Sequence, residues 1–145
     1  MKAILQHDER DCGAACLAMI AEHYGYTQSL NFYRDLTHTD QSGASAYEIV
    51  QAAASIGFSA EALSGRIEDL QNGLKEGEIK LPFIAHVTTE DHSRHFVVVS
   101  AVSKRKMHIC DPAKGKIVES PDDFARRWTG NIICFEKNET AENSV

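Results

Sequence analysis

The first part of the chain has the spacing of an amphipathic helix. From residue 12 to residue 24, side chains that prefer a protein interior recur at intervals of three and four, and His23 follows the same stripe. Asp11 stands in front of this segment as the expected N-cap, and Gly25 follows it as the expected C-terminal stop. The pattern predicts a helix at 12–24 with one buried face.

Further helices are expected in the same half of the chain. Ser45 and Glu48 have the spacing of a capping box and open a helix that ends at Gly57. Ser29 is the expected cap of a shorter helix. The other predicted elements are this short helix at 30–36, a strand near 58–62 and a helix of one or two turns at 67–74.

Beyond Pro82 the pattern changes to short runs of β-branched residues separated by polar turns, which is typical of strands. The predicted strands lie at 83–89, 94–103, 106–112, 116–120 and 130–137, with a short capped helix at 120–128. Helices followed by strands favour an α+β domain, in which N-terminal helices pack on a mostly antiparallel C-terminal sheet.

Composition narrows the class of protein. The chain has 145 residues, 43% of them hydrophobic and 25% charged, with a formal net charge of −6. These values favour one folded domain, predicted at 1–137, followed by a polar tail or linker at 138–145. No basic cluster of the size that nucleic-acid binding needs is present. No apolar run approaches the roughly 18 residues of a membrane span.

The cysteines are expected to be reduced. The opening sequence MKAILQHDERD turns charged too early for a signal peptide, and a chain of this size can form a core without disulfides. A cytoplasmic location follows as the expectation. Cys16, Cys110 and Cys134 each lie within an apolar pattern, which is typical of buried structural cysteines.

Cys12 differs in its position at the start of a helix. The free N–H groups and the dipole of a helix N-terminus favour a thiolate, and Gly13 adds no side chain that blocks approach to the sulfur. Two interpretations remain open from the residue alone: a buried structural cysteine, or a nucleophile.

A thiolate nucleophile needs a histidine. His95 begins the strand HFVVVSAV, in which Phe96 and Val98 point to one face and Val97 and Val99 to the other, so the ring is held at the mouth of a buried strand. His86 has a similar place on the preceding strand and is the rival. His92 and His95 could suggest a metal pair, but no zinc-binding spacing accompanies them, and no metal site is expected.

The partner of the histidine follows from hairpin geometry. If strands 94–103 and 106–112 pair through SKRK, residue i faces roughly residue 207 − i or 206 − i. His95 then faces Asp111 or Pro112 and lies close to Asp111 and its neighbour Cys110, whereas His86 does not meet Asp111 directly. The alternative is that Asp111-Pro112 is only a turn that ends a strand. The pairing favours His95 as the ring beside a carboxylate.

Several segments together resemble a known family. Gln6, DCGAACLAMIAEHYG, GAS before the third helix, HFVVV, DPAKG and a final W-x-G are similar, in order and spacing, to the bacteriocin-processing cysteine peptidases. These are papain-like, double-glycine leader peptidases at the cytosolic N-terminus of peptidase-containing ABC transporters. The resemblance extends from Gln6 to about Phe135. Arg10 departs from it, because relatives often have Ser or Thr there.

The resemblance implies a papain-like fold and a catalytic set. Cys12 is the implied nucleophile, His95 its acid and base, Asp111 the residue that orients the ring, and Gln6 the side chain of the oxyanion hole. The roles that the residues themselves suggest agree with this set. No cofactor is expected.

The family also implies the substrate and partners. Its members cut a precursor peptide after a Gly-Gly or Gly-Ala pair that ends an amphipathic helical leader. We expect fusion to transmembrane and ATP-binding transporter domains on the cytosolic face of the bacterial plasma membrane. The candidate substrate wall is Gly43, Ala44, Tyr47 and Val50, where core packing is the alternative for Tyr47 and Val50.

Two other functions stay open at this point. A catalytically idle domain that only binds a leader and presents cargo to a transporter would share most of these features, but would not need the complete Cys, His and Asp set. A different papain-like thiol enzyme, such as an acyltransferase or a deamidase, would use the same set on another substrate.

Overall fold

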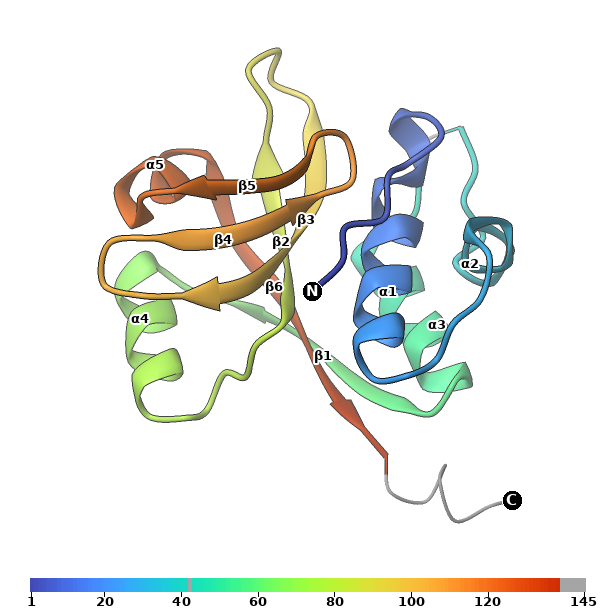
Figure 1. Cartoon of the computed structure of the whole chain (residues 1–145), viewed down its shortest axis with the longest axis horizontal. Helices are drawn as coiled ribbons and strands as arrows, with labels where there is room; N and C mark the ends of the chain where they lie inside the picture. The colour runs from blue at the N-terminus through green and yellow to red at the C-terminus, as the bar shows by residue number, and fades with distance from the viewer. Residues whose placement is uncertain (42, 139–145) are drawn as a thin grey trace.

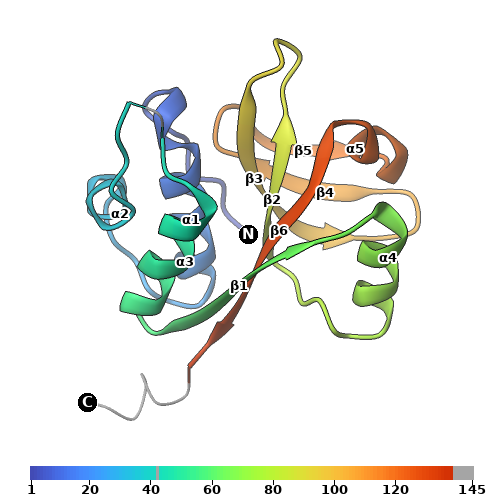
Figure 2. The same ribbon diagram turned by 180° about the vertical axis from the view of Figure 1, so that it is seen from behind.

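The computed structural model describes residues 1–41 and 43–138 and consists of a helical layer beside a curved sheet (Figure 1). Helices α1, α2 and α3 lie together on one side of the sheet, α4 and α5 lie on the other, and the view from behind agrees (Figure 2). The helical elements are η1 Glu9–Asp11, α1 Cys12–His23, α2 Leu30–Leu36, α3 Ala46–Ser55, α4 Ile67–Lys75 and α5 Pro121–Arg127. The predicted polar tail at 138–145 lies, from residue 139 on, outside the described residues.

The strands form one antiparallel sheet in the order β1-β6-β2-β3-β4-β5. β6, the last strand of the described residues, inserts between β1 and β2, so it pairs with the first strand. The strands are β1 Phe58–Ser64, β2 Phe83–Thr88, β3 Arg94–Val102, β4 Met107–Asp111, β5 Gly115–Glu119 and β6 Trp128–Lys137. The predicted α+β class, with helices packed on an antiparallel sheet, is confirmed.

Two apolar cores cover the two faces of the sheet. The first lies between the sheet and α1–α3 and contains Phe96 and Val98 of β3. The second lies between the sheet and the helices α4 and α5 and contains Val97 and Val99. The alternation predicted for this strand is therefore confirmed, and β3 is buried on both faces, as a central strand of a sheet between two helical layers must be.

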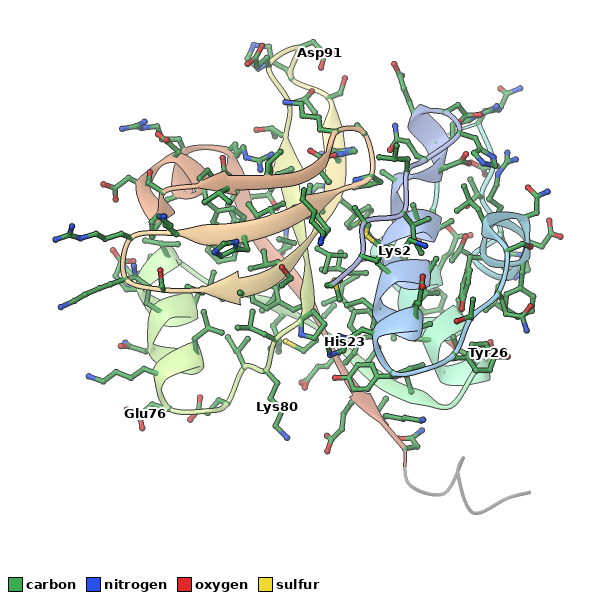
Figure 3. The ribbon with its side chains drawn as sticks, in the orientation of Figure 1. Lys2, His23, Tyr26, Glu76, Lys80 and Asp91 are labelled. Atoms are coloured by element: carbon green, nitrogen blue, oxygen red, sulfur yellow. The ribbon has the colours of Figure 1, made fainter. Side chains whose placement is uncertain are left out.

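Helix α1 is more deeply buried than its pattern predicts. Every residue from Gly13 to Ala21 is buried, because α2, α3 and the sheet surround the helix. The expected single buried face is therefore wrong. His23, which was expected on the buried stripe, is exposed at the end of α1 opposite Cys12 (Figure 3).

The helix caps agree with the sequence except at the first helix. Ser29 and Ser45 accept hydrogen bonds from the first turns of α2 and α3, and Glu48 completes the capping box. Asp11 occupies the N-cap position of α1, but its side chain makes no capping hydrogen bond. Its carboxylate instead accepts hydrogen bonds from the backbone that precedes it. Asp8 caps the short η1 helix.

The pairing of β3 with β4 differs from the predicted register. Val98 faces Cys110 and Val99 faces Ile109. The numbers of paired residues therefore add up to 208, where the predicted pairing gave about 206 or 207. The tight turn is centred one residue later than expected, because Ser103 N–H donates to Lys106 O over 2.8 Å. A register shift follows between Val99 and Ala101. This register sets Asp111 diagonally across from His95 instead of directly opposite, a spacing that a long ring side chain can bridge.

Candidate active site

Cys12 is the first residue of α1 and follows the η1 turn, so its sulfur lies at the N-terminus of the central helix. The side chain is partly exposed and lines a surface cleft. The sequence suggested that Gly13 leaves the approach to the sulfur open, but the structure shows that it serves helix packing. A Cβ on Gly13 would lie 3.0 Å from Ile49 Cδ1 of α3, so the glycine allows α1 and α3 to pack closely behind the thiol.

His95 and Asp111 form a buried pair beside this thiol. The Nε2 atom of His95 lies 2.8 Å from Asp111 Oδ1, and the two residues are 7% and 2% exposed. Asp111 Oδ1 also accepts the backbone N–H of Ala113 over 2.8 Å. The His95 ring hydrogen-bonds with Cys12 as well. Since Nε2 faces the carboxylate, Nδ1 is the ring nitrogen available to the sulfur.

The charges of this pair stabilise a protonated ring. Burial disfavours the imidazolium, but the hydrogen bonds to Asp111 and Cys12 outweigh burial and raise the pKa of His95 from 6.5 to about 9. Burial also disfavours the carboxylate of Asp111, but the hydrogen bonds from His95 and Ala113 lower its pKa below the usual 3.8. The structure thus presents a sulfur, an imidazolium and a carboxylate in sequence, which is the arrangement of a thiol nucleophile with its acid–base group.

Gln6 lies on the N-terminal segment, which runs between α1 and the strands β4 and β5 and brings Gln6 beside the end of β4 (Figure 1). Its backbone N–H donates to Pro112 O over 2.8 Å, next to Asp111. Its side-chain Oε1 is buried and has no hydrogen-bond partner among the described residues. Sequence spacing alone does not reveal this contact, because the residues that make it are far apart in the chain.

The cleft at Cys12 has a volume of about 550 Å³. One wall comes from the segment that leads into α3 and consists largely of small residues, including Gly43 and Ala44. The other wall comes from the sheet and is largely apolar, with Ile84, Phe96, Ile132 and Ile133. The sheet wall was not predicted, because four strands from distant parts of the chain contribute to it.

The two other candidate wall residues lie outside the lining of this cleft. Tyr47 is 72% exposed on the first turn of α3. Val50 packs against the core between the helices and the sheet. Of the four residues predicted to contact substrate, Gly43 and Ala44 therefore share a cleft with Cys12, and Tyr47 and Val50 do not.

Known proteins are similar to this chain over most of its length. The sequence profile of the peptidase C39 family matches residues 1–140. The chain belongs to this family. It is 42% identical over 136 residues to the lactococcin-G-processing and transport ATP-binding protein LagD of Lactococcus lactis subsp. lactis, a match that covers 94% of this chain and 19% of LagD. The chain thus spans about a fifth of the length of the curated relatives that it matches first.

Solved structures show the same fold. The peptidase domain of Streptococcus ComA, a bifunctional ABC transporter, has a TM-score of 0.85 and 31% identity, and the match covers 94% of this chain and 98% of that domain. A double-glycine-motif protease from a transporter, solved in complex with its leader peptide, has a TM-score of 0.84 and 29% identity, with 94% and 91% covered. The fold of this C39 chain is therefore papain-like, as the sequence resemblance implied.

His86, the rival histidine of this C39 chain, lies in a different hydrogen-bond environment. Its Nδ1 is 3.0 Å from Thr129 Oγ1 on β6, and its ring contacts Phe96 with centroids 4.9 Å apart. Burial, followed by the positive charges of Arg94 and His95, lowers the pKa of His86 below 6.5. His86 lines the cleft, and among the described residues it is His95, not His86, that hydrogen-bonds with Asp111.

The other cysteines lie outside the lining of the cleft, and burial raises the pKa of two of them, Cys16 and Cys134. All four cysteines are unpaired. Burial, then the proximity of Cys12, raises the pKa of Cys16 well above 9.0. Burial, then Glu61, raises the pKa of Cys134 to about 11. Cys110 is buried in the first core. Cys12 is thus the cysteine that combines access to the cleft with a histidine partner.

Two kinds of feature are absent from the described residues. In residues 1–41 and 43–138, no group of three or more His, Cys, Asp or Glu side chains is arranged to hold a metal ion. Within the same residues, no helix has the length and apolar character that crossing a membrane requires.

Proposed function

We propose that this chain is a cysteine peptidase that removes the leader from ribosomally made bacteriocin or lanthipeptide precursors, after a Gly-Gly or Gly-Ala pair. The observation that carries this proposal is the hydrogen-bonded series Cys12, His95, Asp111 at the edge of a substrate-sized cleft. Two relatives support the substrate class: LagD, named for processing and transport of lactococcin G, and the transporter protease bound to its leader peptide.

The chemistry follows from the positions of the groups. The Cys12 thiolate attacks the carbonyl carbon of the second leader glycine, and the His95 imidazolium then donates its Nδ1 proton to the leaving amine. Asp111 holds the ring through Nε2 and stabilises its positive charge. The Gln6 amide and the Cys12 backbone N–H bind the oxyanion. Water then hydrolyses the thioester and regenerates the thiol.

The cleft suits the proposed substrate in two respects. Gly43, which has no side chain, and Ala44, which has only a methyl group, belong to the wall beside Cys12, where an extended Gly-Gly segment would lie. On the sheet side of the cleft, Leu63, which is partly exposed, and Phe96 offer an apolar surface to the apolar side chains of an amphipathic leader. The substrate roles of Tyr47 and Val50 remain predictions, and Val50 also serves the core.

We also propose that cleavage is coupled to export. The relatives matched first are transport proteins about five times the length of this chain. Transmembrane and ATP-binding domains would then adjoin this one, and the peptidase would act at the cytosolic face of the membrane. The chemistry above requires no cofactor.

Steady-state kinetics on one precursor tests the proposed specificity. We expect Gly→Val or Gly→Leu at either position before the cut to lower kcat more than the affinity for substrate. The physical reason is that bulk displaces the scissile carbonyl, and ~1 Å of misplacement can cost about 10²-fold. Replacing apolar leader anchors by Asp should mainly raise KM, since each anchor buries a side chain worth roughly 1.5–3 kcal/mol. Changes after the cut should have little effect.

Other outcomes of this experiment identify the alternatives. If a short peptide without the leader is cleaved as well as the whole precursor, or if residues after the cut dominate, the chain is a general papain-like thiol enzyme. If the leader binds and no precursor is cleaved, the chain is an idle leader-binding domain. The complete Cys12, His95 and Asp111 set supports cleavage over binding alone.

The pH dependence of cleavage provides another prediction. The leaving amine requires protonated His95, whose pKa is raised from 6.5 to about 9. Since the acid form is present below this pKa and lost above it, kcat/KM should stay high through pH 8 and fall near pH 9. A profile of kcat/KM from pH 6 to 10 measures this limb for the free enzyme. Returning samples from pH 10 to pH 8 controls for denaturation, and an alkaline limb near 6.5 would contradict the proposed ion pair.

A further inference from the structure

A buried carboxylate next to the nucleophile has no part in the chemistry described so far. Asp11 directly precedes Cys12, has 0% exposed surface and does not cap α1. Burying a charge without hydrogen bonds and an opposite charge is costly. The partners of Asp11 therefore indicate what this residue does in the fold.

One oxygen of Asp11 organises the segment that carries Gln6. Its Oδ2 accepts hydrogen bonds from the backbone N–H groups of His7 and Asp8, each over 3.1 Å. These are the two residues that follow Gln6. At its other end the segment is attached through Gln6 N–H to Pro112 O. The backbone on both sides of the Gln6 side chain is thereby held in place.

The other oxygen of Asp11 faces a cation. Its Oδ1 lies 2.8 Å from Arg34 Nε, as an ion pair and not an aligned hydrogen bond. Arg34 belongs to α2, which packs on the side of α1 away from the sheet (Figure 1).

The helix that carries Arg34 is itself firmly attached. Tyr33 of this helix is fully buried in the first core, where α2 packs against α1, and its hydroxyl donates to Tyr26 O over 3.3 Å in the segment before the helix. The cation is thus supplied from a packed helix and not from a loose loop.

We propose that the Asp11–Arg34 pair is a positioning element for the oxyanion hole. By holding the backbone at His7 and Asp8, it aims the Gln6 amide at the oxygen that becomes negative when Cys12 attacks. Arg34 touches neither the substrate nor the reacting atoms, and acts only through Asp11 and Gln6. The inference rests on the proposed peptidase function.

The expected effects follow from this route. Losing one oxyanion donor costs about 10²- to 10³-fold in kcat, so Gln6→Ala sets an upper limit. Arg34→Gln should lower kcat about 10- to 10²-fold, with KM changed by less than about 3-fold, because a group displaced by ~1 Å loses much of its effect. Arg34→Lys keeps the charge and should recover most of the loss.

A matched control lies in the same segment. Arg10 forms an exposed ion pair with Asp8 over 2.9 Å. Exposed pairs contribute little, so Arg10→Gln should leave kcat within about 2-fold of the wild type. Arg34→Gln and Arg10→Gln each remove one positive charge from an ion pair. Only the pair of Arg34 includes a buried carboxylate, that of Asp11.

A double-mutant cycle on precursor cleavage tests the inference. If the pair acts through Gln6, Arg34→Gln in a Gln6→Ala background should cost less than about 3-fold, because the donor that it positions is already gone. Losses that multiply would overturn the proposal. Thermal unfolding of each variant checks folding, and if Arg34→Gln does not fold, Arg34→Lys and Asp11→Asn enter the same cycle. A wild-type chain that cleaves no precursor would refute the proposed function, whereas an active chain without this coupling refutes only the positioning role.

Discussion

Replacing Cys12 with alanine is expected to reduce precursor turnover on the order of 10⁶-fold, by analogy with the loss of a nucleophile from other triads. The thiolate forms the covalent intermediate, and no other described cysteine combines access to the cleft with a histidine partner. Leader affinity should change little, because the sulfur is one atom at the edge of a large cleft. Cleavage assays under single-turnover conditions, with leader binding measured separately, give both quantities.

Cys16→Ala is the matched control for this experiment. Cys16 lies one turn further along α1, is fully buried and belongs to the core. Its removal should leave turnover intact and lower the free energy of unfolding by about 1 kcal/mol, as expected for a small core truncation. An active Cys12→Ala chain together with an inactive Cys16→Ala chain would show that the nucleophile is assigned to the wrong cysteine.

Replacing His95 with alanine is expected to cost on the order of 10⁵- to 10⁶-fold in kcat. The substitution removes the proton donor for the leaving amine and the positive charge beside the sulfur, and it leaves Asp111 buried without its ring partner. The rate at which iodoacetamide alkylates Cys12 at pH 7 should fall as well, by at most about 10²-fold, because a thiol without a histidine partner is still a few per cent thiolate at this pH. This second readout separates loss of chemistry from loss of substrate binding.

His108→Ala is a suitable control for the histidine. His108 is exposed on β4, three residues before Asp111, and has no place in the site. Its loss should change neither turnover nor alkylation by more than about 2-fold, as for most surface substitutions. The rival assignment would be supported if His86→Ala abolished turnover and slowed alkylation while His95→Ala retained both.

Much of the fold could be predicted because its signals are local. The capping Ser29 and Ser45, and the β-branched runs of the second half, act on the residues next to them in the chain. Where the signal was not local, the prediction failed. The register of β3 against β4 differs because the turn is centred on Lys104 and Arg105 and a shift follows it, features that alternation alone does not specify.

The sequence by itself determined the types of group at the candidate site and the order in which they occur: an amide at Gln6, a thiol at a helix N-terminus, a histidine at the start of a strand and an aspartate at the end of the next. Hairpin pairing was enough to bring His95 near Asp111, since neighbouring strands tolerate a register error when a long side chain spans the diagonal. Only the tertiary structure decided which surfaces face this set. The sheet wall of the cleft combines residues of four strands, and Asp11, just before α1, forms an ion pair with Arg34 of α2. Such contacts depend on how elements distant in sequence pack, and periodicity along a chain carries no information about that.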